Sequence, residues 1–345
     1  MIAEERRAML VPPGVPGKSS HAGGPKGQPK ESNEPDEPIR MILDTDTYNE
    51  VDDQFALVYA LLSERLRVEA VYAAPFSNGN SIGPGDGMEK SYEEIFRVLD
   101  RLGHPNKGLV YRGSDRYLGS LATPVVSPAT DDLIARALMP RSRPLQVVAI
   151  GAITNIASAL LLAPEIASKI VVVWLGGEPH AWPRPMINAF NLYQDVPASR
   201  LLLDSGVPLV HIPCINVAEH LRTTLPELAE FVKGRGRDTG PGRELIGDYL
   251  HRIVAGYREE ELQHVPSAQR VGYAYSKVIW DVSTIGYLNN PSWAPSELVP
   301  SPVLNDDLTW GPIDPTRHEI REVWSIDRDA MFSDLFARIA SIGGG

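Results

Sequence analysis

Residues 41–57 read MILDTDTYNEVDDQFAL, in which a short apolar run passes through an acidic turn into a second apolar run. The first run, 39–43, has the length and composition of a buried strand. The second run, 51–66, carries Phe55, Val58 and Leu62 at spacings typical of one helix face. A strand that leads directly into a helix is the unit from which α/β folds are built. This stretch therefore predicts an α/β protein whose first strand ends at a group of aspartates.

The same alternation of apolar strands and helix-period segments continues along the chain. We expect further strands at 67–75, 144–152, 169–175, 207–213 and 317–326. We expect further helices at 87–102, 155–162, 195–205, 281–288 and 328–339. The charged region 215–275 is helical in pattern and predicts an excursion or a lid. Together these segments predict one large α/β domain with a mostly parallel, open Rossmann-like sheet flanked by helices, with ligands bound at the carboxyl ends of its strands.

The N-terminal segment differs in composition from the rest of the 345-residue chain. Residues 1–38 contain seven of the 30 prolines and five of the 29 glycines, with little apolar periodicity. Such a segment buries too little apolar surface to offset the entropy lost on ordering. We therefore expect a disordered tail over 1–38 and a single folded domain over 39–345.

The net charge and the cysteine content indicate which binding partners and which cellular compartment to expect. The net charge is −11, from 33 basic and 44 acidic residues, without the basic stripe that nucleic-acid binding needs. The single cysteine, Cys214, excludes an intramolecular disulfide framework and fits a reducing compartment. No apolar run approaches the ~18 residues of a membrane span, and the N-terminus lacks the apolar core of a signal peptide. The sequence therefore predicts a cytoplasmic protein with neither nucleic-acid nor membrane partners.

Four aspartates, Asp44, Asp46, Asp52 and Asp53, crowd the turn after the first strand. One or two acidic residues would suffice to cap the following helix. Four carboxylates in a partly buried turn repel one another, and a bound cation is the simplest remedy. Ligands that are all oxygen favour a hard ion such as Ca²⁺ or Mg²⁺. The turn therefore predicts a metal site.

Two families carry acidic clusters at this place. The run Asp44-Thr45-Asp46-Thr47 resembles the D-x-D-x-T motif of haloacid-dehalogenase-like phosphatases, in which Asp44 would be the nucleophile and Asp46 the acid/base, with Mg²⁺ as cofactor. That family needs a second acidic pair after a later strand. Asp306-Asp307 is the available pair, and it follows a weak strand pattern.

The second family matches over nearly the whole folded part. The run D-T-D-T-Y-N-E-V-D-D-Q at 44–54 resembles, with a two-residue insertion, the D-x-D-x-G-x-D-D-A of inosine-uridine-preferring nucleoside hydrolases. Residues 151–157 (GAITNIA), 175–177 (LGG) and 188–198 (NAFNLYQDVPA) resemble that family's G-P-L-T-N-I-A, M-G-G and A-E-F-N-x-x-x-D-P-E-A. Trp280-Asp281 resembles its late W-D pair. Five matches in order are far more specific than one D-x-D, so the chain is identified as a divergent member, with a nucleoside hydrolase-like domain at 39–345.

The resemblance implies a Ca²⁺ site and a ribose site. The metal ligands would be Asp46, Asp53, the backbone carbonyl of Thr154, and Asp281, with Asp44 supporting them from a second layer. Thr154 would also suit a helix cap, and both roles can hold together. Ribose hydroxyls would be bound by Asp52, Asn78 and Asn191. Family members are commonly homodimers or homotetramers.

The implied reaction is hydrolysis of the N-glycosidic bond of a ribonucleoside or related N-riboside. Asp46 would remove a proton from a metal-activated water, while anionic oxygens stabilise the oxocarbenium-like sugar. Trp280 stands where many members have a histidine, and this tryptophan resembles the purine-specific branch. Stacking on a base contributes roughly 1–3 kcal/mol, with Tyr111 or Tyr117 as the second ring. Trp280 would equally suit packed core, and His180 is the alternative acid.

Three departures from the family pattern bear on specificity. Asn49-Glu50 is an insertion, Thr47-Tyr48 replaces Pro-Gly, and Ala189 replaces a sugar-binding glutamate. Tyr48 in place of glycine implies a different loop path. Loss of the glutamate leaves open a modified ribose or another glycoside. A non-catalytic sugar- or nucleoside-binding homologue is a further alternative, against which the intact aspartates argue.

Overall fold

The computed structural model describes residues 3–12, 37–181 and 188–342. Within these ranges eight strands form one sheet in the order β3-β2-β1-β4-β5-β6-β10-β9. All neighbours pair in parallel except β9, which is antiparallel to β10. The strands are β1 (Ile39–Thr45), β2 (Leu66–Ala73), β3 (Val110–Arg112), β4 (Leu145–Ala149), β5 (Ile170–Leu175), β6 (Leu209–Ile212), β9 (Ser296–Pro300) and β10 (Glu319–Val323). The predicted single α/β domain with a mostly parallel sheet is confirmed.

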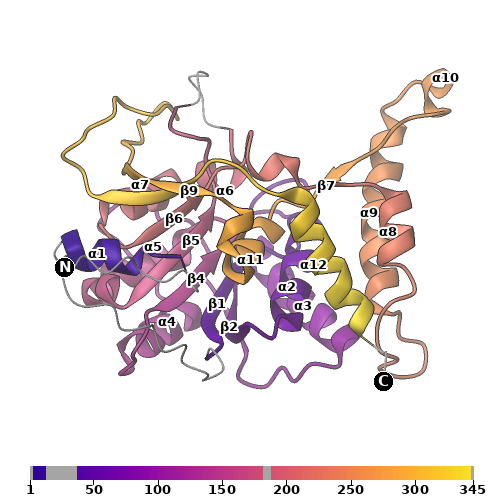
Figure 1. Ribbon diagram of the computed structural model, residues 1–345, viewed down its shortest axis with the longest axis horizontal. Helices are drawn as coiled ribbons and strands as arrows, with labels where there is room; N and C mark the ends of the chain where they lie inside the picture. The colour runs from indigo at the N-terminus through magenta and orange to yellow at the C-terminus, as the bar shows by residue number, and fades with distance from the viewer. Residues whose placement is uncertain (1–2, 13–36, 182–187, 343–345) are drawn as a thin grey trace, which may run out of the picture.

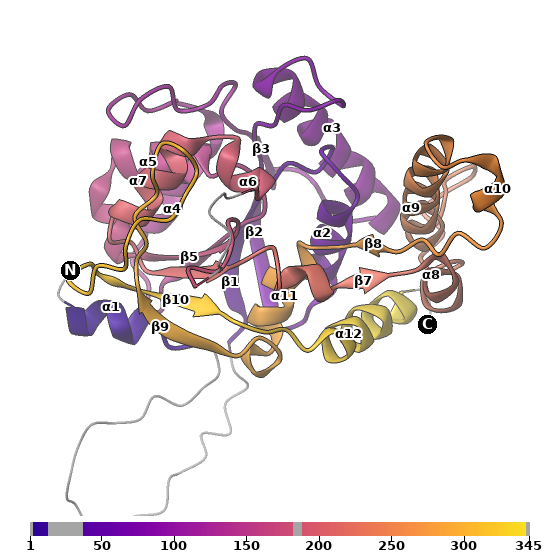
Figure 2. The same cartoon turned by 90° about the horizontal axis from the view of Figure 1, so that it is seen from above.

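Helices cover both faces of this sheet, in two separate apolar cores. Figure 2 shows the two groups on opposite sides of β1 and β2. One face carries α4 (Pro128–Leu138), α5 (Thr154–Leu162) and α7 (Val196–Asp204). The other carries α2 (Asp52–Leu62), α3 (Pro84–Leu102), α11 (Val282–Asn289) and α12 (Arg328–Ser341). Because both faces are covered, every residue of β4 and β5 is buried, which explains their continuous apolar sequences.

The carboxyl ends of the inner strands lie level with one another. Thr45 at the end of β1 pairs with Ala73 at the end of β2, and Asp44 pairs with Ala149 at the end of β4. Ala149 in turn pairs with Trp174 of β5. The loops that follow these strands therefore meet at one edge of the sheet, where the predicted site residues lie.

The excursion between 215 and 275 is helical, as predicted. It contains α8 (Leu225–Phe231), α9 (Ile246–Gln263) and α10 (Ser267–Arg270), and it joins the body through the antiparallel pair β7 (Arg222–Thr223) and β8 (Lys277–Val278). Figure 1 shows α9 and α10 projecting from the main body. Its action as a lid stays a prediction. The described residues also form the short helix α6 (Phe190–Tyr193) and the 3₁₀ turns η1 (Pro164–Ser168), η2 (Ala218–His220) and η3 (Pro291–Trp293).

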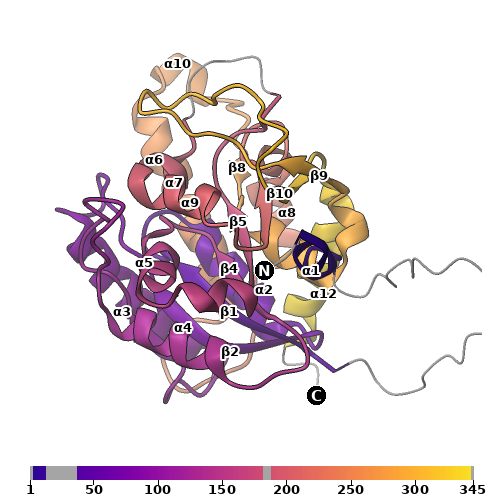
Figure 3. The same ribbon diagram turned by 90° about the vertical axis from the view of Figure 1, so that its left-hand side faces the viewer.

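The expectation of a disordered tail is wrong for the first described residues. Helix α1 (Ala3–Met9) is followed by Leu10, which is 1% exposed within the core on the α2 face. Arg7 pairs with Glu319, and Arg321 donates to the Leu10 carbonyl at 2.7 Å, which places α1 beside β10 (Figure 3). The buried Leu10 and these polar contacts stabilise α1, although the composition of the segment predicts disorder. Residues 13–36 lie outside the described ranges, and the domain boundary at 39 stays a prediction.

No helix in the described part of the chain is long and apolar enough to span a membrane.

Candidate active site

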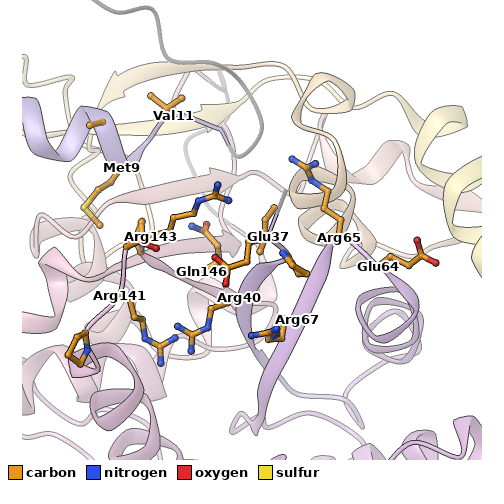
Figure 4. Close-up of a pocket in the computed structure, with 16 residues that line it drawn as sticks. Met9, Val11, Glu37, Arg40, Glu64, Arg65, Arg67, Arg141, Arg143 and Gln146 are labelled. Carbon is orange, nitrogen blue, oxygen red and sulfur yellow. The ribbon is translucent and has the colours of Figure 1, made fainter. Parts of the chain in front are cut away.

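Two cavities lie at opposite ends of the strands. The larger, about 1140 Å³, is at the amino ends of β1, β2 and β4, where Figure 4 shows Arg40, Arg67 and Arg141 among the residues that line it. Arg40 and Arg141 both pair with Glu69. The smaller cavity, about 330 Å³, lies at the carboxyl ends and is lined by six of the predicted site residues: Asp52, Asp53, Asn78, Asn191, Trp280 and Asp281. These six predicted site residues therefore come together at the smaller cavity.

Three carboxylates converge at this cavity. Asp52, Asp53 and Asp281 each place an oxygen within 4.8 Å of the others. Asp46 is fully buried, and neither of its carboxylate oxygens has a hydrogen-bond partner among the described residues. A Cβ added to Gly151 would lie 3.0 Å from the Asp46 carboxylate, so a side chain there would crowd Asp46. We call Asp46, Asp52, Asp53 and Asp281 the aspartate cluster.

Burial and mutual repulsion raise the pKa values throughout the aspartate cluster. Burial is the largest cause for each carboxyl, followed for Asp46 by Asp53 and for Asp281 by Asp52. The pKa of Asp53 rises to about 7, although its hydrogen bond from Thr45 opposes the shift. Carboxylates this close together can all be ionised only if a positive charge lies nearby. The two unpartnered oxygens of Asp46 are available to bind such a charge. The cluster therefore fits a hard divalent cation.

Asp44 and Thr154 are fully buried and are not among the residues that line the cavity. Asp44 accepts a hydrogen bond from Asn155 at 2.7 Å, and Asn155 in turn accepts from the Ser114 backbone and hydroxyl. Burial raises the pKa of Asp44 to about 7. The Thr154 hydroxyl donates to Asp195 at 2.6 Å, and no side chain caps α5. The suggested capping role of Thr154 is therefore wrong, and its role as a carbonyl ligand stays a prediction.

The two predicted asparagines differ in what they leave free for a ligand. Asn191 donates both hydrogens of its amide, to the carbonyls of Ile150 and Leu175, and so has only Oδ1 to offer. These bonds tie the ends of β4 and β5 together. Asn78 lines the cavity, donates to Asn49 at 2.6 Å and accepts from the Asn80 backbone. Asn78 rather than Asn80 is therefore the residue at the cavity.

The inserted pair Asn49-Glu50 is part of the cavity wall, which the sequence did not predict. Glu50 pairs with Lys277 at 2.8 Å, and Tyr257 of α9 donates to the Asn49 carbonyl at 3.4 Å. The insertion therefore connects the site to the excursion. Tyr48 is not among the described non-glycine residues with positive φ, so the loop follows a path that does not need glycine there.

The aromatic side chains are arranged differently from the prediction. Trp280 both lines the cavity and packs against the core, and the second ring among the described lining residues is Phe190. Tyr111 instead packs edge-on against Tyr72, at 5.8 Å between ring centroids. Tyr117 donates to Gln194. Neither tyrosine is among the residues lining the cavity, so both suggestions for a stacking partner are wrong, since these hydroxyls bond elsewhere.

His180 is also absent from the residues that line the cavity. It is nearly buried against His211 and Trp310, and burial lowers its pKa to about 4. A neutral imidazole away from the cavity cannot protonate a leaving base, so the alternative role of His180 as the acid is wrong.

Glu178 lines the cavity, although it is not among the residues that the sequence predicts there. Its Oε1 accepts from the Asn188 backbone at 2.9 Å, next to Ala189, while Oε2 is buried and has no partner among the described residues. Burial raises its pKa. Its position directly after Gly176-Gly177 at the end of β5 was the available signal.

The phosphatase alternative is not supported by this geometry. Asp306 lies in an exposed loop, where its side chain is 95% exposed and pairs with Arg200. Asp44, the nucleophile in that alternative, is fully buried behind the cavity. The two acidic groups that a phosphatase site would join are thus apart, because 306–307 follow an edge strand and not an inner one.

Comparisons with known proteins agree with the fold. A family model described as inosine-uridine preferring nucleoside hydrolase matches residues 41–333. The pyrimidine-specific ribonucleoside hydrolase RihA of Klebsiella pneumoniae (strain 342) is 30% identical over 244 residues, covering 65% of this chain and 74% of that protein. Among solved structures, the plant nucleoside hydrolase PpNRh1 is similar with a TM-score of 0.65 at 20% identity, covering 88% of this chain and all of that one. The purine-preferring ribonucleoside hydrolase from Gardnerella vaginalis has a TM-score of 0.63 at 20% identity, covering 87% and 98%.

Proposed function

Since this chain belongs to the inosine-uridine preferring nucleoside hydrolase family and is an N-ribosyl hydrolase, we propose that it hydrolyses ribonucleosides with Ca²⁺ as cofactor and Asp46 as general base. The observation that carries the proposal is the aspartate cluster at the carboxyl ends of the strands. Asp46 in particular is buried with two oxygens that no described residue bonds.

The ligand atoms proposed for Ca²⁺ come from Asp46, Asp53, Asp281 and the Thr154 carbonyl. All four of these donors are oxygens, and six to eight oxygen donors suit Ca²⁺, so water and substrate hydroxyls complete the set. A bound ion would orient the sugar hydroxyls and make a water easier to deprotonate.

Side chains of the aspartate cluster and of the cavity wall are proposed to carry out proton transfer, sugar binding and charge stabilisation. Asp46, with its pKa raised by burial and by its neighbours, holds the proton removed from the attacking water. Asp52 accepts hydrogen bonds from ribose hydroxyls, as do Asn191, through Oδ1, and Asn78. The surrounding carboxylates stabilise the positive charge that develops on the sugar.

The leaving base is proposed to lie between Trp280 and Phe190, the two aromatic residues among the described residues that line the cavity. A purine offers more ring surface to such a pair than a pyrimidine, which favours purine nucleosides. The relative RihA is named as pyrimidine-specific, so base preference needs a direct measurement.

Glu178 is proposed to bind the sugar in place of the family's glutamate, whose position is occupied by Ala189 in this chain. Its unpartnered Oε2 points to an acceptor for a sugar hydroxyl, beside the position that Ala189 leaves without a carboxylate. An ordinary ribose then remains a suitable substrate.

The test is a panel of purine and pyrimidine nucleosides incubated with the full chain and Ca²⁺, with free sugar and phosphate measured. We expect sugar release that EDTA removes, that Asp46→Asn lowers by about 10²-fold or more, and that the exposed control Asp329→Asn leaves unchanged. Phosphate release, or sugar release that Asp46→Asn does not affect, would contradict the proposal. Ligand binding without turnover would favour the non-catalytic homologue.

A further inference from the structure

A second cluster of ligand-type side chains lies outside the aspartate cluster. His180 follows β5, His211 lies on β6 and Glu322 lies on β10, so three separate elements bring it together. Nδ1 of each histidine is 3.1 Å from Oε2 of Glu322. One ligand atom from each residue lies within 4.8 Å of the others. We call these residues the His–Glu cluster.

The hydrogen bonds of His211 decide which of its nitrogens carries a proton. Its Nε2 contacts the carbonyl oxygen of Gly176, which can only accept, so Nε2 must carry the hydrogen. In a neutral imidazole, Nδ1 then holds a lone pair. That lone pair faces the Glu322 carboxylate at 3.1 Å, and two acceptors do not approach so closely without a positive charge between them. Either a proton, on His211 or on Glu322, or a metal ion lies between the two atoms.

His180 favours the metal ion. Its Nδ1 is aimed at the same carboxylate oxygen, and its Nε2 is buried without a partner among the described residues. The rings of His180 and His211 stack with centroids 5.4 Å apart, and Trp310 packs edge-on against His180 at 5.3 Å. Without an ion, Nδ1 of His180 would donate a hydrogen to Glu322, and Nε2 of His180 would be a buried acceptor without a partner among the described residues. An ion at the convergence point would instead accept the lone pairs of both Nδ1 atoms and balance the charge of Glu322.

We propose that His180 Nδ1, His211 Nδ1 and Glu322 Oε2 bind a first-row transition-metal dication of the Zn²⁺ class, at a site separate from the aspartate cluster. Ligands about 2.0–2.2 Å from a tetrahedral ion lie roughly 3.4 Å apart, a few tenths of an ångström beyond the 3.1 Å observed. The Gly176 carbonyl plays the part of the outer hydrogen-bond partner that metal-binding histidines usually have. Imidazole nitrogens distinguish this site from the all-oxygen cluster, so each selects its own class of ion.

The position of the site suggests what it does for the cavity. Glu178 lies between Gly176, which bonds His211, and His180, which is itself a ligand. A Cβ on Gly177 would lie 3.3 Å from the His211 ring, so the loop rests directly on that histidine. An ion there joins the loop to β6 and β10 and holds Glu178 at the cavity wall. The site does not depend on which reaction occurs in the cavity.

The test uses the full chain, freed of metal with a chelator and supplied with excess Ca²⁺. Binding of Zn²⁺ is followed by calorimetry, and Co²⁺ by its visible absorption, which reports the nitrogen ligands. We expect one equivalent of Zn²⁺ per chain. Glu322→Gln and His180→Ala should each weaken binding by more than the roughly 10–100-fold that loss of an outer partner costs. Asp281→Asn and His251→Ala should leave it unchanged.

His211 lies in an inner strand, so replacing it would endanger folding, and the test does not use it. Glu322→Gln keeps the side-chain shape, and His180 lies in a loop, so both of these variants are expected to fold. Unfolding curves recorded with each variant establish that it is folded. Zn²⁺ binding that is absent in the parent chain, or equal in Glu322→Gln and the parent, would overturn the proposal. Two protons on His211, seen by nitrogen NMR and unchanged by Zn²⁺, would show an imidazolium–carboxylate pair instead.

Discussion

Replacement of Asp44 by asparagine should remove a pH-dependent loss of stability from the metal-free protein. Asp44 is fully buried, accepts one hydrogen bond from Asn155 and has an Oδ2 without a partner among the described residues. Its pKa rises from 3.8 to about 7, chiefly because burial disfavours the charged form. The folded state therefore binds the Asp44 proton more tightly than the unfolded state does.

The direction and size of the effect follow from this difference. Stability from the protonated carboxyl is fully present below pH 3.8 and is lost as the pH rises through about 7. The whole loss is about 4 kcal/mol, of which about 2.5 kcal/mol falls between pH 5 and pH 8. An asparagine at position 44 does not ionise, so this share of the loss should disappear.

The assay is urea unfolding of the parent chain and Asp44→Asn at pH 5 and pH 8, with EDTA and with saturating Ca²⁺. In EDTA the parent should lose more free energy of unfolding between the two pH values than the variant, by about 2.5 kcal/mol. The exposed control Asp329→Asn should behave like the parent. Ca²⁺ should reduce the loss in the parent, because it stabilises the ionised carboxylates. Equal losses in parent and Asp44→Asn would refute the reasoning.

Three further predictions concern the cavity and the N-terminus. Trp280→Ala should lower kcat/KM for the preferred nucleoside by roughly 5- to 150-fold, corresponding to 1–3 kcal/mol of stacking; an equal effect on all substrates, including those with a non-aromatic leaving group, would contradict stacking. Glu178→Gln should raise KM for nucleosides more than for their 5′-deoxy analogues, which lack the 5′-hydroxyl, and steady-state rates with both substrates measure this; an identical change in KM for both substrates would exclude a contact between Glu178 and the 5′-hydroxyl. Leu10→Ala should lower the free energy of unfolding by about 2–5 kcal/mol, since the side chain is 1% exposed; a loss below 0.5 kcal/mol in urea unfolding would show that α1 does not stabilise the domain.

Strands and helices with strong apolar patterns were predictable, and those with mixed patterns were not. The inner strands β4 and β5 are buried on both faces, so each is a continuous apolar run in the sequence. The edge strands β3 and β9 were missed because β3 has three residues and β9, SELVP, is half-buried. Helix α4 was missed although Ser127 and Thr130 form a capping box at its start.

The sequence by itself determined the α/β fold, the aspartates at the end of β1 and, through ordered motifs, the places of Asn191 and Asp281. These depend on local patterns, because a strand and the turn that follows it are adjacent in the chain. Only the tertiary structure decided that Glu178 and Phe190 line the cavity, that Tyr111 does not, and that two histidines meet one glutamate. Parallel strands place the ends of distant segments side by side, and pairing across 111 residues, as for His211 and Glu322, leaves no periodic trace in the sequence.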